Sequence, residues 1–456
     1  MSNYKKNKSS QVDLMSGKTK KIKYLEKCLR FMASMILKKY KPKIIAITGS
    51  IGKTSTKEAV YAVLFRNFNV RKSEKNYNNE IGVPLTIIGT DSGEGSFFGW
   101  CLVALRWLAV WIFPIKYPEV LILEMAADRA GDLQYLVEFA HPDISIITDI
   151  SASHLEYFKT LDEILKEKAT LVKALDKQGL AILNIDNIYL EKLKNGLNAN
   201  VLSFGFAENA DVRAMDVFLN CCGENGDLLG FLQRKINGLS FKLNYKGTTM
   251  PMRLNNILAK HNIYAALGGV SAGIGMGMNL VEIGASLENF ILPSGRMNLI
   301  SGIKNSFIID DTYNASASST LAALEMLCEL RGDRKIAVLG DMLELGVNTE
   351  KDHMAVAKKF LEIKGDVFFA VGKRMQFAVE ELKKNNFKGE IYVFQNPMDA
   401  GLKLQEILCN GDVVLVKGSQ GMRMEKVVEE TMLEPQKAPG LLCRQSEKWK
   451  NIPFST

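Results

Sequence analysis

The sequence predicts an α/β fold, in which a central domain with a mostly parallel sheet is followed by a Rossmann-like C-terminal domain. Apolar runs of strand length alternate with helical patterns over residues 44–293, and a second such series occupies residues 294–433. The runs are almost wholly apolar, which is typical of parallel strands covered on both faces. A glycine-bearing loop at residues 49–52 joins the first strand to a helix, an arrangement typical of a P-loop domain.

Each element can be assigned in chain order. In the central domain the expected strands are Lys43–Thr48, Val120–Met125, Ile144–Ile150 and Leu180–Ile185, followed by a β-rich stretch at about 200–255 and a helix at Asn262–Met276. In the C-terminal domain the expected strands are Phe307–Asp311, Lys335–Leu339, Val367–Val371, Glu390–Phe394 and Val413–Lys417. We expect residues 434–456 to form a loose tail.

Length and composition exclude several classes of protein. The 456 residues suffice for two or three domains, and 47% hydrophobic with 24% charged residues excludes a disordered chain. Seven cysteines include no CxxC pair, which favours a reducing cytoplasm over a secreted disulfide framework. The sequence therefore predicts a cytoplasmic protein, and we expect a monomer.

The net charge of +8 is concentrated at the N-terminus. Residues 1–43 contain thirteen Lys or Arg against two acids, a balance of +11, which leaves −3 for the remainder. Apolar residues recur at helical spacing over residues 22–40, so this arm contains a basic amphipathic helix after a polar tail. Because the body of the protein is not basic, the charge predicts no nucleic-acid partner.

The segment Phe97–Ile115 is the most apolar in the chain. It contains one charged residue, Arg106, and three of the four tryptophans. A full membrane crossing is excluded, because it would place strands of one sheet on opposite sides of a bilayer. The segment is either a buried or partner-covered helix, or a helix in a membrane interface, where Trp is favoured.

The sharpest motif is the loop from Gly49 to Thr54, with Ser55 opening the following helix. Its glycines allow backbone N–H groups to surround phosphates, Lys53 can reach the β and γ phosphates, and the Thr54 hydroxyl can hold Mg²⁺. The loop residues expected to contact nucleotide are Gly49, Ser50, Ile51, Gly52, Lys53, Thr54 and Ser55. The alternative is a glycine turn with an exposed lysine; the strand-loop-helix context favours ATP or GTP binding.

Two further polar residues follow buried strands. Glu124 ends one strand, and His154 comes shortly after the next. Each alone is typical of an ordinary loop or capping residue. Together with the phosphate loop they predict a ligand site, because open α/β sheets bind ligands at the carboxyl ends of their strands.

Ten motifs in order resemble the Mur ligases, and more narrowly the MurF type, which adds D-alanyl-D-alanine to UDP-N-acetylmuramoyl-tripeptide in peptidoglycan synthesis. They are TGSIGKTSTKE (48–58), NYNNEIGVPLT (76–86), EMAADRAGDLQYL (124–136), HLEYF (154–158), EKATLV (167–172), KHNIYAAL (260–267), SGRM (294–297), DDTYNASASST (310–320), LGDMLELG (339–346) and LVKGSQGMRME (415–425). The resemblance covers residues 43–430.

The resemblance implies an ATP-dependent, ADP-forming amide ligase that works through an acyl phosphate. It implies that Lys53 binds the β and γ phosphates, that Thr54 and Glu124 hold one Mg²⁺, and that His154 holds a second. Lys168 matches the lysine that these enzymes carbamylate with CO₂, and so serves as a metal partner. On the residues alone, Lys168 is a solvent lysine in a charged helix.

The resemblance also implies roles for residues of both domains. Asn262, Arg296 and Asp311 match residues that contact the nucleotide. The residues implied near the peptide substrates are Asn78, Asn79, Lys417 and Ser419. Asp341, Glu344 and His353 belong to a stretch whose role stays open between loop structure and function.

The chain also departs from the family pattern. The family places a separate UDP-binding domain before the ATP-binding strand, whereas here the preceding residues are 1–43, so the usual uridine pocket is not expected. The apolar segment 97–115 is an insertion. Both departures suit peripheral association with an anionic membrane. Two alternatives therefore stay open: a ligase acting on a different or lipid-linked carboxylate, and a membrane-bound nucleotide-dependent scaffold without ligase activity.

Overall fold

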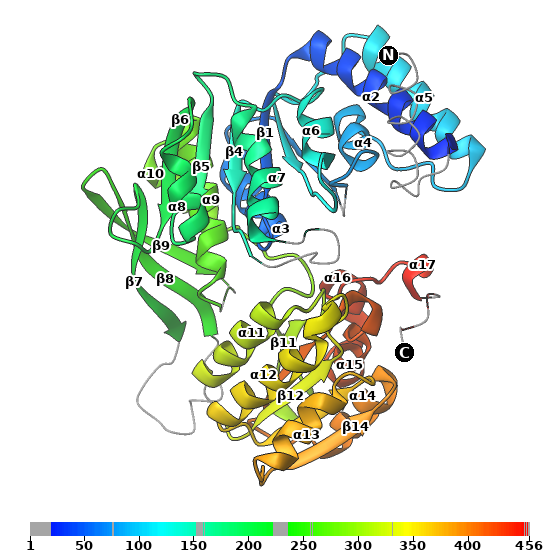
Figure 1. Cartoon of the computed structure of the whole chain (residues 1–456), viewed down its shortest axis with the longest axis vertical. Helices are drawn as coiled ribbons and strands as arrows, with labels where there is room; N and C mark the ends of the chain where they lie inside the picture. Colours follow the sequence, from blue (N-terminus) through cyan, green and yellow to red (C-terminus); the bar gives the residue numbers. More distant parts are fainter. Residues whose placement is uncertain are drawn as a thin grey trace, which may run out of the picture.

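Two α/β domains lie one above the other in the computed structural model (Figure 1). The structure describes residues 20–74, 77–151, 158, 160–221, 236–255, 257, 259–330, 332–450, 452 and 454. His154, one of the predicted site residues, lies outside these residues.

The central domain is built on a nine-stranded sheet with the order β2-β3-β1-β4-β5-β6-β7-β8-β9. Its strands are β1 (Lys43–Thr48), β2 (Val70–Lys72), β3 (Val120–Glu124), β4 (Ile144–Ile147), β5 (Leu180–Asn184), β6 (Asn200–Gly205), β7 (Val212–Cys221), β8 (Ile236–Tyr245) and β9 (Thr248–Asn255). Neighbours from β2 to β7 pair in parallel, and β7, β8 and β9 pair antiparallel. The predicted mostly parallel sheet and its β-rich extension are thus confirmed.

Helices cover both faces of this sheet, which explains its continuous apolar strands. Along β1, Ile45 and Ile47 pack on one face against α3 (Lys53–Leu64), α9 (Asn262–Gly275) and α10 (Leu280–Leu287). Ile44 and Ala46 face the other side. There the sheet is covered by α2 (Lys20–Tyr40), α4 (Gly82–Ile88), α5 (Phe97–Ile112), α6 (Asp132–Val137), α7 (Leu161–Lys173) and α8 (Ile188–Lys194).

The C-terminal domain has a six-stranded sheet with the order β10-β11-β15-β12-β13-β14, parallel except for the first pair. Its strands are β10 (Asn298–Ser301), β11 (Phe307–Asp311), β12 (Lys335–Gly340), β13 (Val367–Val371), β14 (Glu390–Phe394) and β15 (Val413–Lys417). Helices α11 (Ala317–Glu329), α12 (Thr349–Glu362) and α13 (Gln376–Lys384) pack on one face, and α14 (Pro397–Ile407) and α15 (Glu425–Thr431) on the other. This is the predicted Rossmann-like domain.

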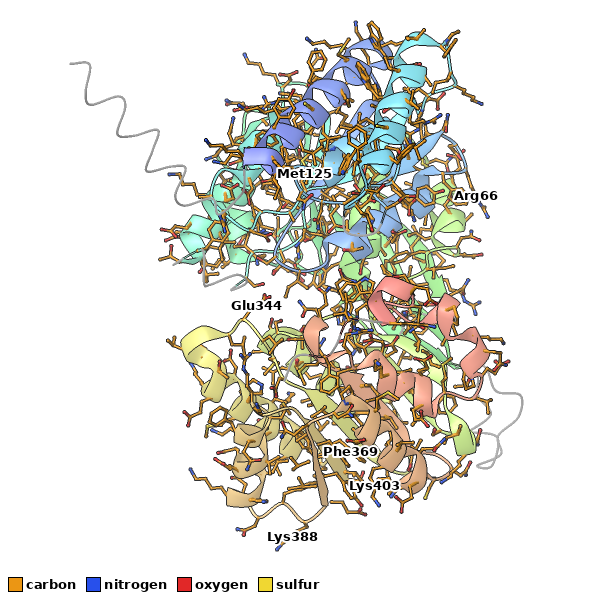
Figure 2. The ribbon with its side chains drawn as sticks, turned by 90° about the vertical axis from the view of Figure 1, so that its right-hand side faces the viewer. Arg66, Met125, Glu344, Phe369, Lys388 and Lys403 are labelled. Atoms are coloured by element: carbon orange, nitrogen blue, oxygen red, sulfur yellow. The ribbon has the colours of Figure 1, made fainter. Side chains whose placement is uncertain are left out.

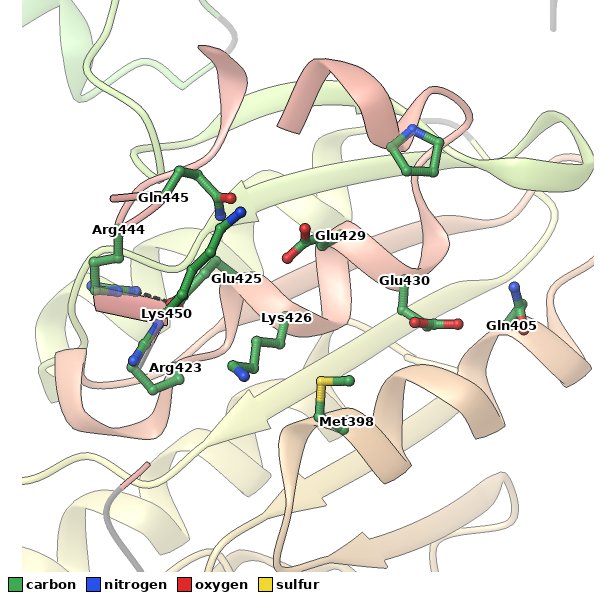
Figure 3. Close-up of a pocket in the computed structure, with 11 residues that line it drawn as sticks. Met398, Gln405, Arg423, Glu425, Lys426, Glu429, Glu430, Arg444, Gln445 and Lys450 are labelled. Atoms are coloured by element: carbon green, nitrogen blue, oxygen red, sulfur yellow. Dashed lines mark hydrogen bonds and ion pairs between the residues drawn. The ribbon is translucent and has the colours of Figure 1, made fainter. Parts of the chain in front are cut away.

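The prediction of a loose tail after residue 433 is wrong for the described residues. The segment forms a 3₁₀ turn (Pro435–Lys437), α16 (Ala438–Leu441) and α17 (Glu447–Lys450). Ala438 of α16 packs in the apolar cluster that includes α15, and Arg423 Nη1 donates to Trp449 O of α17 at 2.6 Å. Arg444 donates from Nη2 to Glu425 Oε2 at 2.7 Å, and Arg423 Nε donates to Glu425 Oε1 at 2.7 Å. Figure 3 shows these three side chains converging beside Gln445 and Lys450. The buried ion pair between Arg444 and Glu425 joins residues 19 positions apart and leaves no local sequence pattern.

We expect Arg444→Ala to destabilise the C-terminal domain. The substitution leaves Glu425, 1% exposed, with one cation instead of two and frees the carbonyls of Thr312 and Tyr313. Removing one partner from a buried ion pair costs about 3 kcal/mol of unfolding free energy. Urea unfolding followed by circular dichroism measures the loss, and Lys437→Ala, at an exposed cation, is the control. Equal unfolding midpoints for the two variants would contradict this assignment.

Candidate active site

The phosphate loop connects the end of β1 to the first residue of α3. Gly49 has φ +152° and Gly52 has φ +84°, and a Cβ built on Gly49 would lie 2.0 Å from Thr148 Oγ1. Both positions therefore require glycine. Among the described residues no side chain caps the start of α3, so its first N–H groups suit an anion.

The loop is held in place by β4 and the residues after it. Ser50 Oγ donates to Ser151 O at 2.9 Å, and Thr148 Oγ1 donates to Ile51 O. Ile51 itself is 40% exposed, whereas Ser55 is buried in the first turn of α3. These hydrogen bonds fix the loop against the end of β4.

Lys53 lies folded back over this loop. Its Nζ donates to Gly49 O at 2.7 Å and to Ser50 O at 3.3 Å. Burial lowers the pKa of Lys53, while the nearby carboxylate of Glu124 acts in the opposite direction. The ammonium is thus positioned at the mouth of the phosphate cradle with a carboxylate close by.

Glu124 projects from the end of β3 toward the loop. Its Oε1 accepts from Thr54 Oγ1 at 3.3 Å and from Asn78 Nδ2 at 3.1 Å. Its Oε2 is buried and accepts no hydrogen bond from the described residues. The Lys57 ammonium lies 3.8 Å from that oxygen. A carboxylate oxygen oriented beside a threonine hydroxyl and without a donor is the ligand type that Mg²⁺ prefers.

Sequence reasoning missed Lys57. It is 2% exposed and donates to Ser73 O at 2.8 Å, and it comes within ion-pair distance of Glu58 and Glu124. A signal was present, because residues four apart on α3 share a face and Lys57 follows Lys53 by one turn.

Lys168 lies on α7, near the same end of the sheet. It is 4% exposed, and its ammonium shows no hydrogen bond or ion pair to any residue that the structure describes. Burial lowers the pKa of Lys168 to about 7, and the positive charge of Lys53 acts in the same direction. The adjacent Glu167 accepts from the N–H groups of Gly131 and Leu133, both at 2.9 Å, which fixes α7 against α6. The alternative that Lys168 is a solvent-exposed lysine is therefore wrong, because the side chain is buried.

The C-terminal domain contributes a cation to the loop. Arg296 Nη2 donates to Thr54 Oγ1 at 3.2 Å, and its guanidinium stacks over the ring of Tyr313, 4.2 Å from the centroid. This contact joins the two domains at the proposed phosphate site. The Arg296 guanidinium therefore lies where it would neutralise charge on a phosphate bound at the loop.

A second group of predicted residues lies at the start of α9 and the ends of β11 and β15. Lys417 Nζ donates to Asp311 Oδ2 at 2.6 Å and to Asn314 O at 2.9 Å. Asn262 is 5% exposed, and its Nδ2 has no acceptor among the described residues. Burial lowers the pKa of the preceding His261, and Asp311 opposes that shift, which places this pair near the domain junction. The buried Asn262 amide is free to donate to a ligand.

Two of the residues predicted near substrate are engaged within the fold. Asn79 Oδ1 accepts from Gly82 N at 2.9 Å at the start of α4. Ser419 Oγ accepts from Leu343 N at 2.8 Å and is 3% exposed. Both side chains shape loops, while Asn78 reaches Glu124 directly.

The stretch from Asp341 to His353 has a structural explanation. The Asp341 carboxylate accepts from the backbone N–H groups of Arg374 and Met375, and His353 Nε2 accepts from Met342 N at 3.1 Å. Burial lowers the pKa of His353. Figure 2 shows Glu344 on the side of this domain that faces the central domain.

Family models match both domains. The model described as "Mur ligase middle domain" matches residues 47–98 and 111–272, and "Mur ligase, glutamate ligase domain" matches residues 295–420. The gap in the first match, residues 99–110, falls within α5.

Individual relatives and solved structures agree with the family models. The UDP-N-acetylmuramoyl-tripeptide–D-alanyl-D-alanine ligase of Bacillus subtilis is 28% identical over 408 residues, covering 89% of this chain and 79% of the relative. A crystal structure of MurF from Acinetobacter baumannii superposes with a TM-score of 0.72 at 25% identity, covering 88% of this chain and 79% of that one. MurF from Thermotoga maritima in complex with ADP gives a TM-score of 0.72 at 24% identity, covering 90% and 84%.

Proposed function

The chain belongs to the Mur ligase family, and on that premise we propose that it joins D-alanyl-D-alanine to UDP-N-acetylmuramoyl-tripeptide with cleavage of ATP to ADP and phosphate. Such a reaction belongs to peptidoglycan synthesis, and through it to cell shape and division. The observation that carries the proposal is the junction at Thr54, where the phosphate loop, Glu124 and Arg296 of the other domain meet.

ATP and Mg²⁺ fit the residues present. The glycine cradle, the uncapped start of α3 and the Lys53 ammonium suit the phosphates of ATP. Thr54 and Glu124, whose buried Oε2 accepts no hydrogen bond from the described residues, would hold one Mg²⁺. We propose His154 for a second Mg²⁺. When bound, the metal ions neutralise charge on the phosphates.

The reaction requires two anions to meet. The acceptor carboxylate attacks the γ-phosphorus, forming a C–O–P link as the bond to the β-phosphate oxygen breaks and ADP leaves. The dipeptide amine then attacks the acyl carbon, phosphate leaves with the C–O bond electrons, and the nitrogen loses a proton. Lys53 and Arg296 reduce the repulsion between the carboxylate and ATP, because both cations lie at the phosphate loop.

Other residues position the two substrates. We propose that Asn262, Arg296 and Asp311 contact the nucleotide, and that Asn78 and Lys417 lie near the peptide substrates. Asn79 and Ser419 support the loops on which those contacts depend. Closure of the two domains around the acyl phosphate would exclude water.

We also propose that Lys168 is a carbamate in the active enzyme. The neutral ε-amine adds to CO₂, forming an N–C bond and releasing one proton, which converts a buried cation into a carboxylate-like anion. Its burial without a described partner supports this assignment. The product would be a metal partner beside Lys53.

The test is phosphate release from ATP in the presence of both substrates, with each omitted in turn. Release that requires both supports the proposal. Release with a lipid-linked muramoyl-tripeptide but not with the UDP-linked compound would favour the alternative acceptor. Absence of release with every acceptor would favour the scaffold interpretation.

We expect Glu124→Gln to weaken the dependence of the reaction on Mg²⁺. The amide keeps the shape of the side chain but removes the charge and one acceptor oxygen, so the Mg²⁺ concentration for half-maximal activity should rise at least about tenfold. A titration of phosphate release against Mg²⁺ measures the shift. Glu138→Gln, at a half-exposed carboxylate at the C-terminal end of α6, is the control.

We place the enzyme in the cytoplasm, as a monomer without a nucleic-acid partner, at the inner face of the membrane. Within the described residues no helix is long and apolar enough to span a bilayer.

A further inference from the structure

Helix α5 carries an unusual outward face. Phe98, Leu102, Leu105 and Ile112 lie four, three and seven residues apart, so they form one stripe along the helix. Their side chains are 81%, 63%, 60% and 57% exposed. Scattered exposed apolar residues are ordinary, but a continuous stripe of large ones marks an interaction surface.

The opposite face of α5 is firmly packed. Val103 and Val110 are buried, and Trp107 Nε1 donates to Met32 O of α2 at 3.1 Å. At its end, Tyr40 OH and Lys39 Nζ both donate to Val110 O, at 2.8 and 3.1 Å. Because α5 is fixed in this orientation, the exposed stripe is a property of the folded protein.

The surroundings of the stripe are basic. Helix α5 contains no acidic residue and one cation, Arg106. Helix α2 lies beside it (Figure 1). Apart from Lys39, whose ammonium is hydrogen-bonded to α5, the exposed cations of α2 are Lys20, Lys21, Lys27 and Lys38. The arm to which α2 belongs, residues 1–43, has a balance of +11. The apolar stripe of α5 beside the lysines of α2 suits a partner whose surface is anionic and whose interior is apolar.

The positive charge beside the α5 stripe distinguishes between two possible partners of this surface. A second copy of this chain, docked through α5, would bring two basic α2 helices toward each other. A bilayer containing anionic lipid accepts both the lysines and the apolar stripe.

We propose that α5 lies flat in the interface of an anionic membrane, with the stripe from Phe98 to Ile112 among the acyl chains and the α2 lysines among the headgroups. At 16 residues, α5 is too short to cross. This refines the proposed location of the ligase and does not depend on its substrate.

The placement has a consequence for the active site. Helix α4 packs against both α2 and α5, and the loop that precedes α4 contains Asn78, which contacts Glu124. The membrane-bound helices therefore lie one helix away from the metal-binding carboxylate. A lipid-linked acceptor would reach the site from that side.

Vesicle flotation of the full chain tests the proposal. We expect binding to vesicles of phosphatidylcholine and phosphatidylglycerol in equal parts at low salt, and at least tenfold weaker binding to phosphatidylcholine alone. The double variant Leu102→Glu with Leu105→Glu should bind the anionic vesicles at least tenfold more weakly. Its control is Val281→Glu with Val347→Glu, at side chains 69% and 100% exposed elsewhere, which should bind as the unchanged chain does.

Two results would overturn the proposal. One is equal binding of both double variants to anionic vesicles, provided that their melting temperatures match. The other is a dimer in vesicle-free solution that the α5 variant abolishes, since the stripe would then bind a second copy. Phosphate release with soluble substrates, measured on the same samples, reports separately on the ligase reaction.

Discussion

Lys53→Met is expected to reduce phosphate release by about a thousandfold, the loss typical of removing a charge that stabilises a phosphoryl-transfer transition state. The Lys53 ammonium lies at the phosphate cradle, 2.7 Å from Gly49 O, and methionine fills a similar volume without charge. The effect should fall mainly on kcat, because the backbone N–H groups of the loop still bind the phosphates. Steady-state phosphate release at varied ATP separates kcat from KM.

Arg66→Met is the matched control for this variant. Arg66 follows α3 at its other end and is an exposed cation on the outside of the central domain (Figure 2), so its loss should leave kcat unchanged. If Lys53→Met kept more than a tenth of the activity, the role assigned to Lys53 would be wrong. A nucleotide-binding measurement on both variants shows whether the loop is intact.

The phosphate site could be predicted from sequence because its determinants are local. The backbone conformation at Gly49 and Gly52 requires glycine, and Lys53 and Thr54 follow directly in the sequence. Apolar runs predict the strands on either side of the loop. The position of Glu124 follows from a less specific rule, that the carboxyl ends of parallel strands meet at one edge of a sheet.

Contacts between distant segments could not be predicted in the same way. The bond from Arg296 to Thr54 joins residues 242 positions apart, and the pairing of Arg444 with Glu425 depends on how the last helices pack. The exposed stripe of α5 is a similar case, because a helix that is apolar all round does not indicate which face the fold covers.

Lys168→Ala is expected to lower phosphate release by at least about a hundredfold, with partial recovery on addition of acetate or propionate. The substitution removes the proposed carbamate and leaves a cavity beside the phosphate loop, since Lys168 is 4% exposed. A short carboxylate can occupy that cavity and replace the missing negative charge. Rescue would not follow if Lys168 acted as an ammonium, because an added anion then has the wrong sign.

Lys166→Ala is the control on the same helix. Its side chain is exposed, so activity should stay unchanged, with or without added carboxylate. Rescue of Lys168→Ala by methylamine instead of acetate would contradict the carbamate and support a cationic role.

The pH dependence of the unsubstituted enzyme is a second test of the proposed carbamate on Lys168. Only the neutral amine adds to CO₂, and burial lowers the pKa of Lys168 to about 7 from its ordinary value of 10.5. As the pH falls through about 7, the amine becomes protonated and cannot form a new carbamate. Stimulation of CO₂-depleted enzyme by added bicarbonate should therefore be largest above pH 7 and disappear below about pH 6.

A lysine with an unshifted pKa would instead remain almost wholly protonated at pH 7.5, and stimulation would keep rising up to pH 10. Phosphate release from CO₂-depleted enzyme, measured across this range with Lys168→Ala alongside, distinguishes the two cases.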